Sequence, residues 1–236
     1  MGDTLTGHAC RRCEPATAGH HRARGTVTGS LRGVQRTETP WGPWEPAALS
    51  EVVRLFSAAR VPWWIAGGHA IELAVGHSFR GHDDIDVLLL RRDQLAAQQM
   101  LPDWEWWAAD PPGTLRPWRA GECLPPSVHD IWCRPGPARP WRIQVMLDEA
   151  EGDEWISRRH RGVRRPLRLA GARSATGVPY LAPEIQLFYK AYGTGEKDER
   201  DFAAALPVLG GEQRRWLARS LHVAYGDHPW HDRLGR

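Results

Sequence analysis

The stretch WIAGGHAI, residues 64–71, carries two glycines at the end of an apolar segment, and DDIDV, residues 83–87, follows it across a short loop. Residues 61–66 form a short apolar run, which predicts a buried strand, and residues 70–75 predict a helix directly after the glycines. Residues 85–90 are apolar and rich in β-forming types, which predicts a second strand. This order of strand, glycine turn, helix, loop and strand predicts an α/β unit.

The DDIDV segment concentrates negative charge on an apolar strand. On a strand, Asp84 and Asp86 point to one face while Ile85 and Val87 point to the other. Two carboxylates on one face repel each other, and a divalent cation with oxygen ligands holds both ionised. The alternative is that Asp83 and Asp84 cap a turn and that Asp86 is exposed.

Gly67 and Gly68 stand between the predicted strand and the predicted helix. Two glycines let the backbone approach an anion closely, and the N-terminus of a helix favours phosphate. A glycine pair is also common in ordinary turns. Combined with the carboxylate pair, however, it indicates a site for a magnesium nucleotide.

Outward from this unit, further elements follow from the apolar spacing. Helices are predicted from residue 49, from 93 to 101, and repeatedly from 183 onward. Strands are predicted at 104–108, 128–133 and 141–147, the last two as an antiparallel pair. An α/β N-terminal domain followed by a helical C-terminal part accounts for this order.

Composition limits the classes of protein. The 236 residues are 42% apolar and 25% charged, with a formal net charge of +3 that lies wholly within the first 40 residues. A neutral body argues against a nucleic-acid partner, and no apolar run is long enough for a membrane span. We therefore expect a cytoplasmic protein with no membrane association. Residues 1–38 lack apolar periodicity, which predicts a disordered extension.

WIAGGHAI, the loop that contains Arg80 and His82, and DDIDV together resemble the signature of the DNA polymerase β-like nucleotidyltransferase superfamily. Within it, the chain is most similar to the aminoglycoside and lincosamide adenylyltransferases, over roughly residues 45–230. The resemblance implies a polymerase β-like mixed sheet with flanking helices in residues 45–160. It also implies a smaller helical domain in residues 175–230.

The resemblance implies a reaction as well. An acceptor hydroxyl attacks the α-phosphate of a nucleoside triphosphate, most simply ATP, and pyrophosphate leaves. Asp84 and Asp86 would hold Mg²⁺, and Gly67 and Gly68 would hold the triphosphate. The acceptor would be a small hydroxylated molecule such as an aminoglycoside or lincosamide antibiotic. Two alternatives remain open: transfer of AMP to a protein, as in antitoxin-type members, and a nucleotide-binding protein that has lost the chemistry.

The resemblance also implies a third carboxylate that acts as general base. Here the sequence departs from the usual pattern of the superfamily. The strand 141–147 is its expected position, yet Gln144 lies near the strand centre. Asp148 and Glu149 follow at the strand end, and strand parity favours Asp148, with Glu149 second and Asp130 on the adjacent strand third. The alternative is that Asp148 and Glu149 form only an acidic turn.

Two cations are expected near the phosphates. Lys190 resembles the family lysine that contacts the nucleotide, with a solvated helix lysine as the alternative, and the guanidinium of Arg80 suits a phosphate geometrically. Lys197, Asp198 and Asp201 are expected to stabilise a helix surface. The tryptophans at 104, 106, 107 and 118 flank a proline-rich loop, where they either stack on an acceptor or pack in the core.

Overall fold

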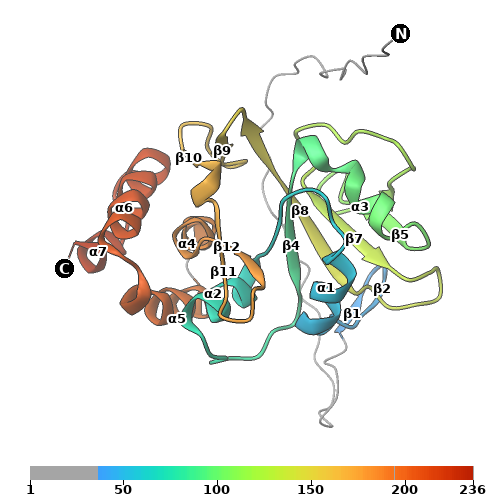
Figure 1. Ribbon diagram of the computed structural model, residues 1–236, viewed down its shortest axis with the longest axis horizontal. Coiled ribbons are helices and arrows are strands. Elements are labelled where there is room, and N and C mark those ends of the chain that lie inside the picture. Colours follow the sequence, from blue (N-terminus) through green and yellow to red (C-terminus); the bar gives the residue numbers. More distant parts are fainter. Residues whose placement is uncertain (1–36, 194, 236) are drawn as a thin grey trace.

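The predicted strand, helix and strand are present in the computed structural model, which describes residues 37–193 and 195–235 (Figure 1). Strand β3 (Trp63–Ile65) leads into helix α2 (Gly67–Val75), and strand β4 (Asp86–Leu90) follows the loop. The two glycines are the first residues of α2 instead of a turn before it. The helix therefore begins three residues earlier than its apolar spacing indicates.

Strands β3 and β4 lie near the middle of a mixed sheet. Among the described residues this sheet has ten strands, in the order β11-β12-β3-β4-β8-β7-β5-β6, with β9 beside β8 and β10 beside β9. The pairs β12–β3 and β4–β8 are parallel, and the other pairs are antiparallel. The remaining strands are β5 (Glu105–Ala108), β6 (Arg116–Pro117), β7 (Asp130–Arg134), β8 (Ile143–Glu151), β9 (Glu154–Ile156), β10 (Arg164–Pro166), β11 (Gly171–Arg173) and β12 (Pro179–Leu181).

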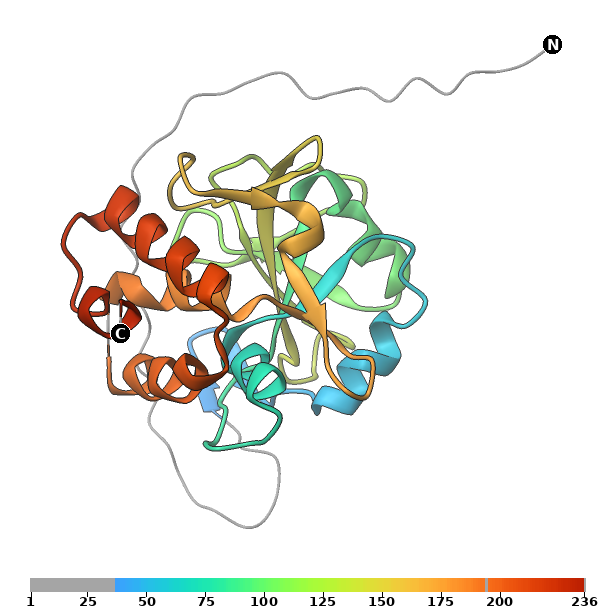
Figure 2. The same ribbon diagram turned by 60° about the vertical axis from the view of Figure 1, so that its left-hand side comes forward.

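Two hydrophobic clusters pack on the two faces of the sheet, because successive strand residues point to opposite sides. One face carries Ile65, Val87 and Leu89 against helices α1 (Leu49–Phe56) and α3 (Leu95–Met100). We call the other face the helical face. It carries Trp64, Leu88 and Leu90 against the C-terminal helices, which gather on one side of the sheet (Figure 2). These helices are α4 (Pro183–Lys190), α5 (Glu196–Ala205), α6 (Gly211–Tyr225) and α7 (His231–Leu234).

The predicted mixed sheet with flanking helices and a helical C-terminal part is confirmed. The sheet also includes β11 and β12, so it continues past residue 160, which is the predicted end of the first domain. Short 3₁₀ turns join several elements, at Arg91–Asp93, Leu167–Leu169, Ala191–Gly193 and Leu206–Val208. Within the described ranges, no helix has both the length and the apolarity needed to cross a bilayer.

A small hairpin precedes the first predicted element. Strand β1 (Thr37–Thr39) pairs with β2 (Gly42–Trp44), and Trp44 bridges to Trp141 just before β8. Residues 37 and 38, which the sequence assigns to a disordered extension, thus form part of a strand. The rest of that predicted extension lies outside the described residues.

Candidate active site

The glycine pair makes close contact with charged side chains. Gly67 has a positive φ of 65°, and a Cβ atom built on it would lie 2.2 Å from Asp86 Oδ2. A Cβ on Gly68 would lie 2.0 Å from Arg80 Nη2 and 2.5 Å from His82 Cε1. The backbone N–H of Gly67 donates to Gln186 Oε1 on α4, at 2.8 Å. The start of α2 is thus packed directly against a carboxylate and a guanidinium, which only glycine permits.

Asp86 begins β4 and lies on the face that the sequence predicts, and Asp84 lies just before the strand. Ile85 and Val87 are fully buried in the opposite cluster, whereas Asp84 and Asp86 remain partly exposed. The backbone N–H of Ala66 donates to Asp86 O at 2.9 Å, which fixes the end of β3 beside the start of β4. The two carboxylates and the N-terminus of α2 therefore lie together.

Arg80 and Lys190 both contact Asp201, a buried residue that the sequence predicts on a helix surface. Arg80 donates to both carboxylate oxygens of Asp201, at 2.7 and 2.8 Å, and Lys190 Nζ lies 2.7 Å from Asp201 Oδ2. Asp201 is fully buried on α5. Burial acts to raise the pKa of Asp201, but the bonds from Arg80 and Lys190 hold that pKa below its usual range. The predicted contact of both cations with nucleotide stays a prediction.

Two histidines and Glu72 hold the loop before β4 onto α2. The rings of His69 and His82 stack with centroids 3.9 Å apart, and His82 Nε2 lies 3.1 Å from Glu72 Oε1. Glu72 also accepts from the backbone N–H of Phe79 at 3.0 Å. Burial, with the nearby His82, lowers the pKa of His69 to about 4, so His69 is neutral near pH 7.

These three side chains place potential metal-binding atoms within 4.8 Å of one another. Arg80 Nη1 lies 3.1 Å from His82 Nδ1, and a guanidinium can only donate. His82 Nδ1 then accepts, and its proton is on Nε2, facing Glu72. This arrangement suits a hydrogen-bonded clamp on the loop and disfavours metal binding through His82.

Asp148 lies within β8 and not at an acidic turn, since β8 extends to Glu151. Its side chain is fully buried and is paired with Arg158. It accepts from Trp155 Nε1 at 2.7 Å and from the hydroxyl of Tyr189 at 2.9 Å. The β4–β8 register sets Asp148 opposite Leu90 at the far end of β4 from Asp86. A general base at Asp148 therefore does not fit this geometry.

Glu149 faces a different part of the chain. Its carboxylate is paired with Arg91, whose Nη1 also donates to the carbonyl of Val128 at 2.8 Å and of Pro125 at 3.0 Å. Glu149 thus helps to hold the proline-rich loop before β7. This contact is structural and is remote from the glycines.

Asp130, the third candidate from the sequence, lies nearer to the acidic pair. Gln144 is directly opposite Asp86 across β4 and β8, and Gln144 Nε2 donates to Asp130 Oδ1 on β7. Asp130 and Gln144 are both partly exposed on the helical face, because Ile131 and Val145 point into the opposite cluster. Asp86, Gln144 and Asp130 thus lie on three neighbouring strands, and Asp130 is two residues along β7 from Trp132, the direct partner of Gln144.

A small crevice of about 40 Å³ lies beside Gly67 and Asp86. Gln186, Tyr189 and Arg158 line its other side, from α4 and the loop after β9. The guanidinium of Arg158 lies 4.0 Å from the ring centroid of Tyr189. Asp148 therefore acts here on the orientation of Arg158 and Tyr189.

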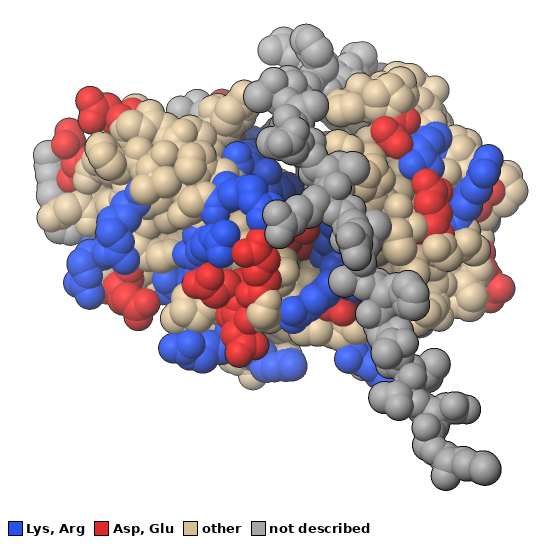
Figure 3. Space-filling model, turned by 90° about the horizontal axis from the view of Figure 1, so that it is seen from above, with Lys and Arg blue, Asp and Glu red and all other residues tan. Residues whose placement is uncertain are grey.

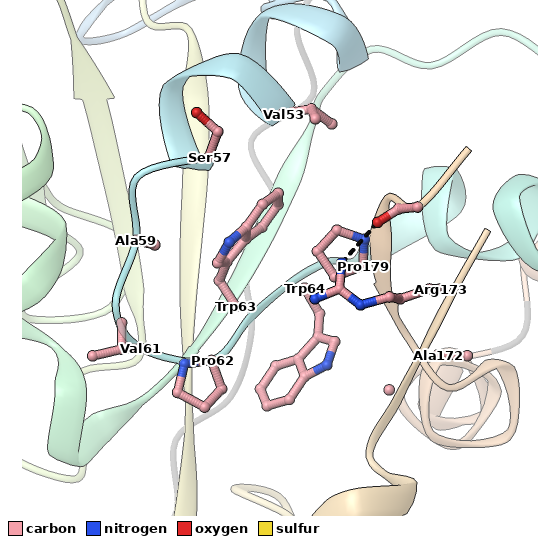
Figure 4. A pocket seen from close by; sticks show the side chains of 12 residues that line it. Val53, Ser57, Ala59, Val61, Pro62, Trp63, Trp64, Ala172, Arg173 and Pro179 are labelled. Carbon is pink, nitrogen blue, oxygen red and sulfur yellow. Dashed lines mark hydrogen bonds between the residues drawn. The ribbon is translucent and has the colours of Figure 1, made fainter. Parts of the chain in front are cut away.

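A larger pocket, of about 630 Å³, opens near the start of β3 (Figure 4). Trp63, Trp64 and Pro179 line it, and Arg173 lies at its edge, donating to the carbonyl of Gly177 at 2.8 Å. Its lining holds no carboxylate, histidine or cysteine. Since Gly67 follows the other end of β3, the pocket is separate from the acidic residues.

The charged surface is mixed at the end of the molecule where β9 and β10 lie. Figure 3 shows basic and acidic side chains next to one another there. Arg161 lies 2.5 Å from Glu151, and Arg164 contacts both Glu151 at 3.1 Å and Glu154 at 3.3 Å. These arginines are compensated by local acids.

Comparison with known proteins identifies relatives of the central segment. A family model described as aminoglycoside-2''-adenylyltransferase matches residues 48–106, which run from α1 into β5. A search of curated proteins gave no match.

Three solved structures match part of this chain. A solution structure of the antibiotic-resistance factor ANT(2'')-Ia is 16% identical, with a TM-score of 0.49 over 75% of this chain and 90% of that one. A crystal structure of ANT(2'')-Ia in complex with adenylyl-2''-tobramycin is 15% identical, with a TM-score of 0.46 over 73% and 94%. Lincomycin-bound lincosamide antibiotic adenylyltransferase LnuA is 16% identical, with a TM-score of 0.47 over 68% and 96%.

The matched segment contains both WIAGGHAI and DDIDV. It confirms the predicted resemblance to the aminoglycoside adenylyltransferases, and it indicates a nucleotidyltransferase.

Proposed function

We propose that this protein transfers AMP from ATP, with Mg²⁺, to a hydroxyl group of a small antibiotic-like acceptor. The observation that carries the proposal is the approach of Gly67 to Asp86, where a Cβ would lie 2.2 Å from the carboxylate oxygen. This contact joins a helix N-terminus, which favours phosphate, to a carboxylate pair, which favours a divalent cation.

Residues at the start of α2 are suited to hold the triphosphate. The first N–H groups of a helix have no partner within the helix, and they carry partial positive charge. Gln186 accepts from the Gly67 N–H, which braces this turn against α4. The N–H groups after Gly67 are then directed toward the phosphates, with Arg80 and Lys190 as supporting cations.

Asp84 and Asp86 supply the oxygen ligands that Mg²⁺ prefers. When bound, Mg²⁺ neutralises charge on the reacting phosphate and on the departing pyrophosphate. Asp84 lies close enough to His69 and Arg80 for electrostatic interaction with both. Because His69 is neutral near pH 7, it adds no positive charge that would compete with the cation.

We assign the general base to Asp130 instead of Asp148. Asp130 accepts from Gln144, the residue opposite Asp86, so its carboxylate is oriented toward the part of β8 that pairs with Asp86. A carboxylate there removes the proton from an acceptor hydroxyl as the hydroxyl attacks the α-phosphate. In this assignment, the position where the family carries its acid is occupied by an amide, and the acid comes from the next strand.

Pyrophosphate release tests the proposed function directly. The purified chain is incubated with ATP, Mg²⁺ and, separately, lincomycin, which has a single amine, or tobramycin, which has several. We expect pyrophosphate release that depends on one of these acceptors, with a product heavier by one AMP in mass spectrometry.

Labelled ATP distinguishes the alternatives. AMP that appears on protein, without an acceptor-dependent product, would support the protein AMP-transferase hypothesis. Binding of a non-hydrolysable ATP analogue without either product would support a nucleotide-binding protein. An Asp103→Asn variant, altered at an exposed acidic residue outside the site, serves as the matched control.

A further inference from the structure

The register of four strands places aromatic side chains in line with the acidic site. Asp86 is opposite Gln144, Gln144 is opposite Trp132, and Trp132 is opposite Trp107. Directly paired strand residues point to the same face, so all four lie on the helical face. We call Trp132 and Trp107 the tryptophan row.

The position of this row is defined by the strand spacing. Neighbouring strands lie about 4.8 Å apart, so Trp132 is roughly 10 Å from Asp86 and Trp107 roughly 14 Å. The start of α2 lies on the opposite side of Asp86, beside β3. A nucleotide held by α2 therefore leaves the side toward β7 and β5 for the acceptor.

The tryptophan row is partly exposed, and the β1–β2 hairpin packs against one end of it. Trp132 and Trp107 are both partly exposed, unlike the buried Trp106 and Trp118 of the same region, which pack in the opposite cluster. The β1–β2 hairpin brings Trp41 and Trp44 edge-on to Trp132, with ring centroids 5.9 and 5.0 Å away. The hairpin is held in place by the hydrogen bond from Trp141 Nε1 to the carbonyl of Trp41, at 2.9 Å.

The far end of the row carries an ion pair with no net charge. The guanidinium of Arg134 lies 6.0 Å from the centroid of Trp107 and 4.2 Å from that of Trp141. Arg134 Nε donates to Glu105 at 2.7 Å, so this acid is already neutralised. A ligand with many positive charges would find no unpaired acid in this ion pair, whereas an uncharged ring face would stack on the indoles.

We propose that Trp132 and Trp107 form the acceptor platform, and that they select a hydroxylated ring compound with an apolar face and at most one positive charge. This inference rests on the proposed function. An acceptor of about 10 Å that stacks on Trp132 extends back over Gln144, which brings its hydroxyl to the phosphate beside Asp86 and to Asp130.

Calorimetry with Mg²⁺ and a non-hydrolysable ATP analogue tests the platform without turnover. The ligands are lincomycin, which carries a single positive charge, and tobramycin, which carries several. We expect tighter binding of the singly charged one, and a loss of affinity of about 10-fold or more in Trp132→Leu and in Trp107→Leu. The affinity for the ATP analogue alone should be unchanged in both variants.

Matched variants separate the platform from a general loss of structure. Trp104→Leu alters a partly exposed tryptophan that packs on the opposite cluster, and it should leave acceptor affinity unchanged. Trp132→Phe should restore most of the binding. Arg134→Gln removes the cation of the ion pair and releases Glu105, so it should improve binding of the multiply charged ligand several-fold.

Three results would overturn the inference: stronger binding of the multiply charged antibiotic by the unaltered chain, equal acceptor affinity in Trp132→Leu and the unaltered chain, or no binding of the singly charged ligand. Failure of the proposed function would appear differently. Acceptor binding that depends on Trp132, without pyrophosphate release, would support the platform and contradict the transfer reaction.

Discussion

Gly67 lies so close to Asp86 that a methyl group on its Cα would sit 2.2 Å from the carboxylate oxygen Oδ2. Gly67 also has a φ of 65°, a region that other L-residues rarely adopt. The same backbone position is therefore restricted twice, by conformation and by space. This allows the two effects to be separated by mutation.

Gly67→Ala should destabilise the fold by about 1–3 kcal/mol and lower transfer at least about 100-fold, since it displaces the Asp86 carboxylate. Chemical denaturation and pyrophosphate release measure the two effects. Gly152→Ala is the matched control, because Gly152 has a φ of 56° and a Cβ added to it would meet nothing within 4 Å. Equal activity losses in the two variants would show that only backbone strain matters.

Asp84→Asn and Asp86→Asn should each lower turnover by roughly 100-fold or more, because each removes a charged oxygen ligand at the reacting phosphate. Stability should be unchanged or higher, since a like-charge repulsion disappears. Steady-state kinetics at several Mg²⁺ concentrations and thermal unfolding measure these effects. Near-full activity of Asp86→Asn would contradict the metal-site assignment.

The strand–helix–strand unit was predictable because its signals are local. Apolar runs, a glycine pair and alternating carboxylates each act over a few residues, and β3, α2 and β4 appear in the expected order. The partner of Arg80 was not predictable in this way. Asp201 is 121 residues away in sequence, and the many charged residues of its helix predict a solvent-exposed surface.

Parity predicts which face a strand residue occupies, but it does not predict its level along the neighbouring strand. Asp148 lies on the predicted face, yet the register pairs it with Leu90, whereas Gln144 pairs with Asp86. Four residues along β8 correspond to about 13 Å. The level follows from the packing of whole strands, which a single sequence does not reveal.

Asp201→Asn should cost about 3 kcal/mol or more of unfolding free energy, because it removes a fully buried carboxylate and leaves the half-buried Arg80 and Lys190 without their shared anion. Asp198→Asn removes a partly exposed partner of Lys190, 3.2 Å away, and should cost less than about 1 kcal/mol. Urea denaturation of both variants gives the comparison. Equal costs would show that Asp201 has no special role in joining α5 to the loop before β4.

Stability should fall as the pH is lowered from about 6.5 toward 4. Burial, with the nearby His82, lowers the folded-state pKa of His69 to about 4, so the unfolded chain takes up a proton in this window and the folded chain does not. The contribution of His69 is up to about 3 kcal/mol, fully present above pH 6.5. His69→Gln should flatten the pH profile of the unfolding free energy, and an unchanged slope would contradict this prediction.

Asp130→Asn and Asp148→Asn should have opposite signatures. Asp130→Asn should lower turnover by about 100-fold with little effect on stability or on the dissociation constant for ATP, since a base acts on the acceptor hydroxyl. Asp148→Asn should destabilise the fold by about 3–5 kcal/mol, because it removes the fully buried carboxylate and leaves the half-buried Arg158 guanidinium uncompensated. Kinetics, ATP binding and chemical denaturation of both variants distinguish the roles, and Glu149→Gln, which affects only the pairing with Arg91, provides the control. A turnover loss confined to Asp148→Asn at unchanged stability would return the base to β8 and contradict the assignment to Asp130.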